Sequence, residues 1–151
     1  MRAAMATLLA LAFGSTYALA QPAPDAKAVE QVVARVYDGY RAGGDPEASG
    51  KTLPFDASLE ALIRRVEKTN SEGIGFDPFC ACQDYEITNV AVKATTVTPQ
   101  DATVVARFRN FGDATQVVYK LVKTPKGWAV HDLILPEAPS FRALMVEAAK
   151  P

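Results

Sequence analysis

The sequence predicts an α+β fold in which two N-terminal helices pack on a curved four-stranded antiparallel meander, followed by a short C-terminal helix. Two observations lead to this fold class. Apolar residues recur every three or four positions up to about residue 70, and they alternate with polar residues from about residue 85. The connections within the second region are short and polar, as antiparallel hairpins require.

The first 20 residues have the order of a secretory signal peptide. Arg2 precedes a nearly uncharged apolar run over residues 3–13, which is too short to cross a bilayer as a helix, and small residues follow. We therefore expect cleavage between Ala20 and Gln21, export from the cytoplasm, and one soluble domain over residues 21–151. The residue directly after the cleavage point is Gln21 and not a cysteine, so we expect no lipid anchor there.

The charge of the expected mature chain is nearly balanced. Removal of residues 1–20 takes away Arg2, which leaves 15 basic and 17 acidic residues and a net charge of about −2. The basic residues are scattered along the chain and do not form the stripe of a nucleic-acid-binding protein, so we expect no nucleic-acid partner. The sequence has no phosphate-binding loop, no Ser–His–acid set and no metal-ligand spacing, so we expect no cofactor and no metal.

Two amphipathic helices are expected before the sheet. The first begins at Asp25, whose carboxylate can cap its N-terminus, and ends at the glycine pair 43–44. Asp56 or Ser58 can cap the second helix, which ends near residues 70–73. The apolar stripe of the second helix consists of Leu59, Leu62, Ile63 and Val66.

Four strands and a last helix are expected after residue 84. We place the strands at residues 85–97, 102–109, 116–123 and 127–135, and the helix at residues 140–149. One face of this sheet is well filled and should pack on the two N-terminal helices. Its residues are Val90, Val92, Val104, Ala106, Phe108, Val117, Tyr119, Leu121, Trp128 and Val130.

The opposite face of the predicted sheet is not cleanly polar. Val105, Val118, Val122, Leu133 and Leu135 alternate onto it among charged residues. Apolar surface of this kind needs a cover. Either the C-terminal helix covers it or another subunit does, and the second alternative predicts a homodimer formed through the sheet.

Three segments resemble one family of proteins. Residues 76–84, Phe-Asp-Pro-Phe-Cys-Ala-Cys-Gln-Asp, resemble the Asp-Pro-x-Cys-x-Cys-Gln-Asp signature of a family of small bacterial periplasmic proteins of unknown function. Residues 127–132 are similar to that family's Gly-Trp-x-Val/Ile-x-Asp strand, and residues 139–144 to its closing helix. The resemblance implies a cone-shaped nuclear-transport-factor-2-like, or cystatin-like, fold and a periplasmic location. It implies no established activity.

Cys80 and Cys82 are the two cysteines of the chain, and an oxidising compartment favours a bond between them. A bridge from i to i+2 closes a loop of about three residues, worth about 1.6 kcal/mol in chain entropy before strain. It also requires a bend, because extended residues two apart lie at the upper limit for a disulfide. A structural disulfide is the leading interpretation. A redox-active pair, a thiolate metal site and free or intermolecular thiols remain open.

His131 and Asp132 differ in their expected surroundings. Strand alternation places His131 on the face opposite Trp128 and Val130, where a surface histidine is expected. The same alternation points Asp132 toward the concave interior, where a carboxylate needs partners or a shifted pKa. Asp132 is therefore a weak catalytic candidate. The alternative is a structural role, in which Asp132 and Asp84 cap loop amides.

The candidate binding set has five residues, which are Asp84, Tyr85, Tyr119, Trp128 and Asp132. They would converge at the mouth of the cone. Three hypotheses for function follow. The leading one is a periplasmic binding or interaction module that presents a cone-shaped pocket to a small apolar molecule or an envelope protein. The others are an immunity or inhibitor protein that blocks a toxic effector, and a small enzyme with an interior Asp base.

Overall fold

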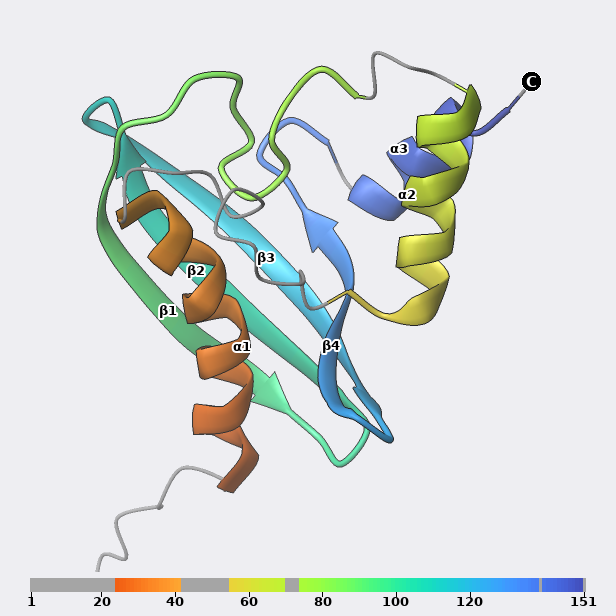
Figure 1. Cartoon of the computed structure of the whole chain (residues 1–151). Helices are drawn as coiled ribbons and strands as arrows, with labels where there is room; N and C mark the ends of the chain where they lie inside the picture. Colours follow the sequence, from red (N-terminus) through yellow and green to blue (C-terminus); the bar gives the residue numbers. More distant parts are fainter. Residues whose placement is uncertain (1–23, 42–54, 70–73, 139, 151) are drawn as a thin grey trace, which may run out of the picture.

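The computed structural model describes residues 24–41, 55–69, 74–138 and 140–150 (Figure 1). In chain order the elements are α1 (Pro24–Arg41), α2 (Ala57–Thr69), β1 (Ile87–Val97), β2 (Asp101–Asn110), β3 (Asp113–Thr124), β4 (Gly127–Ile134) and α3 (Phe141–Ala148). This order confirms the predicted α+β class. The expected signal peptide and its cleavage point at Ala20 and Gln21 lie outside the described residues. None of the described helices is long and apolar enough to cross a membrane.

The four strands form one antiparallel sheet in the order β1-β2-β3-β4. The β2–β3 hairpin closes with a two-residue turn of Phe111 and Gly112, whose φ angles are 49° and 87°. Positive φ at both central residues gives the tight turn that matches the twist of the flanking strands. Gly112 adopts it without steric cost. β3 therefore begins at Asp113, earlier than the predicted residue 116.

An extra residue in β4 changes which side chains face the core. Asp132 pairs with Lys120 of β3, and His131 next to it has no pairing partner. This β-bulge shifts the alternation of side chains by one position. Leu133 and Leu135 therefore turn inward, where they are 0% and 7% exposed. The prediction that these two leucines lie on the opposite face is wrong.

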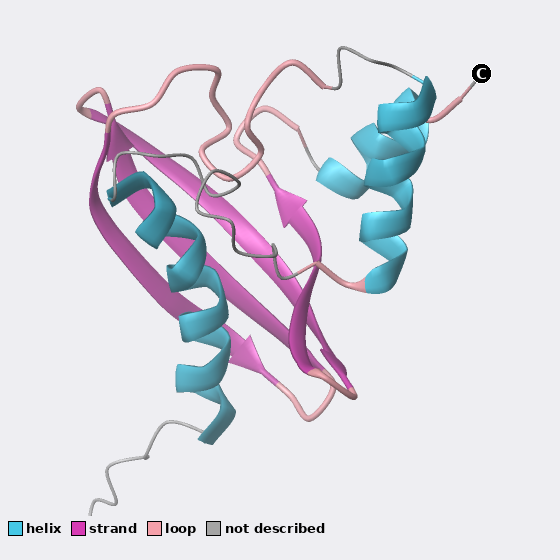
Figure 2. Cartoon of the chain, viewed as in Figure 1, coloured by secondary structure: helices cyan, strands magenta, loops and turns pink. Residues whose placement is uncertain are grey.

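Helix α1 covers the inner face of the sheet (Figure 2). Its residues Val29, Val33 and Tyr37 are fully buried, and the Tyr37 ring packs 5.3 Å from the ring of Phe108, between centroids. The inner face is the one that the sequence predicts. Its buried residues include Val104, Ala106, Phe108, Val117, Tyr119, Leu121, Trp128 and Val130, while Val90 and Val92 pack at its margin.

Helix α2 does not lie over the sheet as predicted, but packs on α3 and beside β4 (Figures 1 and 2). Phe55 forms a parallel bridge with Val130, and the Asp56 N–H donates to the Val130 carbonyl at 2.9 Å. These contacts fix the start of α2 at the open edge of β4. The two helices α2 and α3 thus form a pair on the β4 side of the sheet.

The outer face of the sheet lies opposite α1, and no helix that the structure describes covers its centre. Helix α3 packs on α2 and β4, so the first of the two alternatives, cover by the C-terminal helix, is wrong. Arg107, Gln116 and Lys120 are exposed on this face, whereas Val118 and Val122 are half-buried. The outer face therefore presents an apolar middle between polar and basic side chains.

Candidate functional site

The signature segment, residues 76–84, folds into a loop that pairs with itself. The Asp77 N–H donates to the Cys82 carbonyl at 2.8 Å, and the Cys82 N–H donates to the Asp77 carbonyl at 3.2 Å. A disulfide joins Cys80 to Cys82, whose Cα atoms are 5.1 Å apart. Ala81 between them has a φ of 52° and supplies the bend that so short a bridge requires. Since Cys80 is 1% exposed, the bond serves the shape of the loop.

Two tyrosine hydroxyls join this loop to the core. The Tyr119 hydroxyl donates to that of Tyr37 at 3.0 Å, and the Tyr37 hydroxyl donates to the Phe79 carbonyl at 2.9 Å. Burial raises the pKa of both hydroxyls well above the usual range, so both stay protonated. The Tyr119 proton is bound to the Tyr37 oxygen and the Tyr37 proton to the Phe79 carbonyl, so both hydroxyl protons already have acceptors. This pair therefore has no free proton to donate to the oxyanion of a substrate.

A third tyrosine holds the beginning of the loop. The Tyr40 hydroxyl donates to the Asp77 carboxylate, whose other oxygen accepts the Phe79 N–H at 2.8 Å. Burial raises the pKa of Tyr40, and the hydrogen bond to Asp77 raises it further. The ring of Tyr85 packs edge-on against Tyr40 with centroids 4.9 Å apart. Helix α1 therefore positions the loop through two of its tyrosines.

The role of Tyr37 and Tyr40, two residues of the first predicted helix, was not predicted from the sequence. A signal was present in their spacing of three, which places both hydroxyls on the buried face. Buried tyrosine hydroxyls need hydrogen-bond partners. Nothing in the pattern, however, pointed to Phe79 or Asp77 as those partners, because they lie 42 and 37 residues away.

The five residues of the candidate binding set do not gather at one site. Tyr85 lies at the signature loop, and Tyr119 is fully buried beneath it. Asp84 is exposed, and its carbonyl accepts the side-chain amide of Asn110 at 3.2 Å. Asp84 therefore belongs to the loop and Tyr85 and Tyr119 border it, whereas the other two residues lie elsewhere.

Trp128 lies at the opposite end of the β3–β4 pair. It pairs with Lys123, which is about 13 Å along β3 from Tyr119. The Lys123 ammonium is 4.7 Å from the centre of the indole ring, and the ring is 8% exposed in total. Its indole N–H is buried without a hydrogen-bond partner in the part of the chain that the structure describes. Trp128 therefore does not share a pocket wall with Tyr119.

Asp132 faces away from the interior, so its predicted orientation is wrong. The bulge sets it opposite Lys120, an outer-face residue. Its Oδ1 accepts the N–H groups of Leu133 and Arg142, both at 2.8 Å, and its Oδ2 accepts the Ser140 hydroxyl at 2.7 Å. Asp132 thus fixes the beginning of α3, which is the structural alternative considered for it. The hypothesis of an enzyme with an interior Asp base therefore no longer has Asp132 as its candidate residue.

A cluster of Asp56, His131 and Arg142 ties α2, β4 and α3 together. The His131 Nδ1 lies 2.6 Å from Asp56 Oδ2, and Arg142 Nη2 lies 3.2 Å from Asp56 Oδ1. Asp56 Oδ1 also accepts the Leu59 N–H at 2.7 Å, which caps α2. The Arg142 Nε donates to the His131 carbonyl at 2.9 Å. We call Asp56, His131 and Arg142 the helix clamp.

Electrostatics of the clamp favour a charged Asp56. Burial raises the pKa of this carboxyl, but hydrogen bonds from His131, the Leu59 N–H and Ser58, with the charge of Arg142, outweigh burial and lower the pKa from 3.8 to about 2. Asp56 was predicted only as a helix cap, and Arg142 was not singled out. His131 and Arg142 lie 75 and 86 positions after Asp56, so the local sequence around Asp56 gives no signal for the clamp. The described residues contain no cluster of His, Cys, Asp and Glu that could hold a metal ion.

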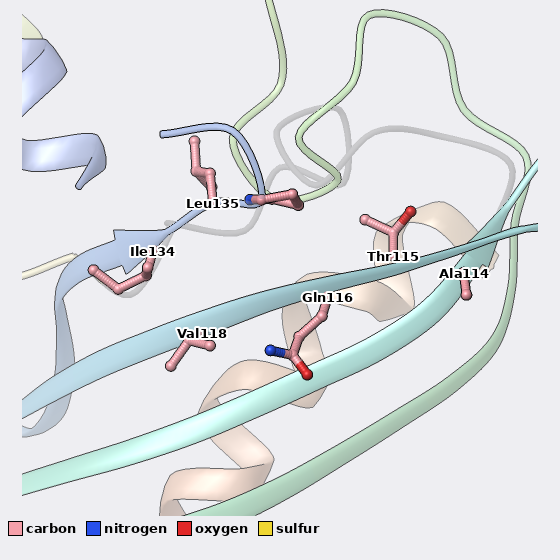
Figure 3. A pocket seen from close by; sticks show the side chains of 7 residues that line it. Ala114, Thr115, Gln116, Val118, Ile134 and Leu135 are labelled. Atoms are coloured by element: carbon pink, nitrogen blue, oxygen red, sulfur yellow. The ribbon is translucent and has the colours of Figure 1, made fainter. Parts of the chain in front are cut away.

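A hollow of about 390 Å³ lies on the outer face where β4 ends (Figure 3). Residues 114–116 and Val118 of β3 line one side of it, and residues 134–136 line the other. The last pair between the two strands is Val118 with Ile134, so β3 continues past the end of β4. The side chains of Val118 and Ile134 form an apolar floor in this view.

Basic side chains border the hollow on the β2 side. Arg107 pairs with Gln116 and Arg109 pairs with Ala114, so both arginines are directly across from lining residues. The Arg109 guanidinium donates to the Gly112 carbonyl, a neutral acceptor. We call the hollow together with Arg107 and Arg109 the outer-face site.

Comparisons with known proteins give one relative and no family. No protein-family model matches the chain. The chain is 28% identical over 140 residues to the Uncharacterized protein YqhG of Escherichia coli strain K12. The match covers 84% of this chain and 45% of that protein, so the chain spans about half the length of this curated relative. The name of the relative states no activity.

Proposed function

We propose that this chain is an exported periplasmic interaction module that binds a partner through the outer face of its sheet. Export and periplasmic location rest on the order of residues 1–20 and on the resemblance of the signature loop to a periplasmic family, which we propose includes this chain. The disulfide between Cys80 and Cys82 supports an oxidising compartment. The cone-shaped fold of that family remains part of the same proposal.

The observation that carries the proposal is the outer-face site. A sheet face with an apolar middle and a hollow at its edge is typical of an interaction surface. The interior of the domain offers less accessible surface to a partner, because Tyr119 is fully buried and Trp128 is nearly so. The binding role is therefore proposed for the outer face and not for the mouth of the cone.

Site-specific photo-crosslinking in the native host tests this function. Benzoylphenylalanine replaces Gln116, an exposed residue that lines the hollow, and in a matched control it replaces Glu67, an exposed residue of α2. We expect the chain in the osmotic-shock fraction and a discrete crosslinked product from position 116 but not from position 67. A chain retained in the cytoplasm contradicts export. Equal products from both positions, or none from either, contradict binding through the outer face.

A further inference from the structure

We infer that the partner segment is an extended, acidic stretch of another protein, which lies along the free end of β3 and directs carboxylates at Arg107 and Arg109. This inference rests on the proposed function and adds the chemistry of the partner. Three features of the outer-face site lead to it: an open strand edge, an apolar hollow and unpaired positive charge.

The open edge belongs to residues 113–117 of β3. These residues pair with β2 on one side, from Asn110 with Asp113 to Ala106 with Val117. On the other side β4 pairs no further than Val118 with Ile134, and the chain turns away at Leu135. Within the described residues no other backbone hydrogen bond is made along this side. Such an edge can accept a peptide as an additional strand.

The hollow lies beside that edge and offers an apolar contact. Val118, Ile134 and Leu135 contribute aliphatic side chains, and Pro136 also lines it. Its volume of about 390 Å³ has room for apolar side chains of an added strand. Because side chains alternate along a strand, every second residue of the peptide would face the outer side, where the hollow and the arginines are.

The charge of the face selects an acidic peptide. Arg107, Arg109 and Lys120 are exposed, and none of them belongs to an ion pair between described residues. Lys120 donates to the Thr103 hydroxyl, which is a neutral acceptor like the Gly112 carbonyl. Guanidinium groups without a carboxylate partner are suited to bidentate binding of carboxylates.

The distances across the sheet allow this contact. A strand added beside β3 lies two strand spacings, about 10 Å, from β2. That gap is spanned when an arginine and a glutamate extend toward each other over the surface of β3. Ala114, the residue across from Arg109, has a short side chain and leaves the path open.

A second copy of this chain fits the face less well. Two outer faces stacked together would bring Arg107, Arg109 and Lys120 of one copy against the same cations of the other. Apart from Asp132 at the bulge, the strand register places one acidic residue on this face, Asp101, and it lies at the opposite end of β2 from Arg107 and Arg109. Like charges brought together oppose association, so charge complementarity favours an acidic partner over self-association.

Selection from a random peptide library displayed on phage tests the inference. The exported chain, purified from the periplasmic fraction, is the bait. We expect enriched peptides that alternate Asp or Glu with apolar residues. Their affinity is measured by fluorescence anisotropy at low and high salt, and we expect it to fall as salt rises.

Charge-reversal variants provide the matched comparison. The double substitution Arg107→Glu and Arg109→Glu should weaken binding about tenfold or more for each arginine. The same change at Arg64 and Arg65, exposed residues of α2, should leave the affinity unchanged. N-methylation of alternate peptide amides should also abolish binding, since it removes the donors that pair with β3 without altering the protein.

Three results would overturn the inference. They are enrichment of peptides that are not acidic, equal binding to the two charge-reversed proteins, and a dimer in sedimentation that occupies the outer face. If position 116 crosslinks but either of the first two results is found, the proposed function stands and only the inference of an acidic partner is wrong. Cytoplasmic retention or the absence of the crosslink removes the proposed function itself.

Discussion

The helix clamp makes a quantitative prediction for Asp56→Asn. The substitution keeps the size of the side chain and removes its charge. It weakens the contacts to His131 Nδ1 and Arg142 Nη2, now 2.6 and 3.2 Å long. The Leu59 N–H keeps an acceptor, because an asparagine also caps helices well. The expected loss is therefore electrostatic and does not include the cap.

The magnitude follows from the pKa of Asp56. Its lowering from 3.8 to about 2, at about 1.4 kcal/mol for each pKa unit, corresponds to about 2.5 kcal/mol. Part of this lowering comes from the Leu59 N–H and Ser58, whose hydrogen bonds an asparagine keeps. The Asp56 side chain is 11% exposed, so solvent screening also reduces the figure, and we expect a loss of about 1–2 kcal/mol at neutral pH. A carboxyl with a lowered pKa stabilises the fold above pH 3.8, and this stabilisation disappears as the pH falls through about 2.

Urea denaturation at a series of pH values measures this effect, with the fluorescence of the buried Trp128 as the probe. The difference in unfolding free energy between wild type and Asp56→Asn should be largest at neutral pH and should shrink below about pH 4. Asp38→Asn is the matched control, because Asp38 pairs with Arg41 at 2.7 Å on an exposed surface. It should cost less than about 1 kcal/mol. A difference for Asp56→Asn that is small or independent of pH would refute the electrostatic role of the clamp.

Three further predictions concern the signature loop and α3. Replacing Cys80 and Cys82 by serine should lower the free energy of unfolding by about 1–2 kcal/mol in urea denaturation, and reduced wild type should have the same free energy of unfolding as the variant. A larger loss in the variant alone would contradict the interpretation that the disulfide only constrains the loop. Tyr37→Phe should cost about 1–3 kcal/mol, because the Phe79 carbonyl loses a buried donor, and an unchanged urea midpoint would refute that hydrogen bond. Ser140→Ala should cost about 1 kcal/mol, since the Ser140 hydroxyl accepts the Ala143 N–H at 3.0 Å, and unaltered thermal unfolding would contradict the cap.

The sequence pattern was sufficient for the strands but not for the placement of the helices. A period of two identified the inner face because burial there depends on alternation along each strand. The apolar stripe of α2 predicted a buried side, which we assigned to the inner face of the sheet. The position of α2 was decided instead by Phe55 and Asp56, which bond to Val130 in β4. Such contacts between distant segments leave no periodic trace in the sequence.

The same limit applies to the candidate site. Asp132 was expected inside because alternation was extended through β4, and the bulge ended that alternation at His131. The contacts that accompany the bulge join separate elements, from Asp132 to Arg142 in α3 and from His131 to Asp56 before α2. The outer-face site was equally hidden, since it depends on where β4 stops relative to β3. The apolar character of Val105, Val118 and Val122 at outer positions indicated that this face needed a cover, but not where on the face a site lies.

The bulge also connects the sheet to the helical pair of α2 and α3. Without His131, Val130 and Leu133 would still pair with Leu121 and Tyr119, and the ladder would simply become regular. The sheet therefore does not need His131, and the side chain of this residue binds Asp56 at the start of α2. A single deletion at this position would leave the sheet in register and remove the contacts of His131 to Asp56 and Arg142. One inserted residue thus adds a link between the sheet and the helical pair without altering the strand pairing on either side of it.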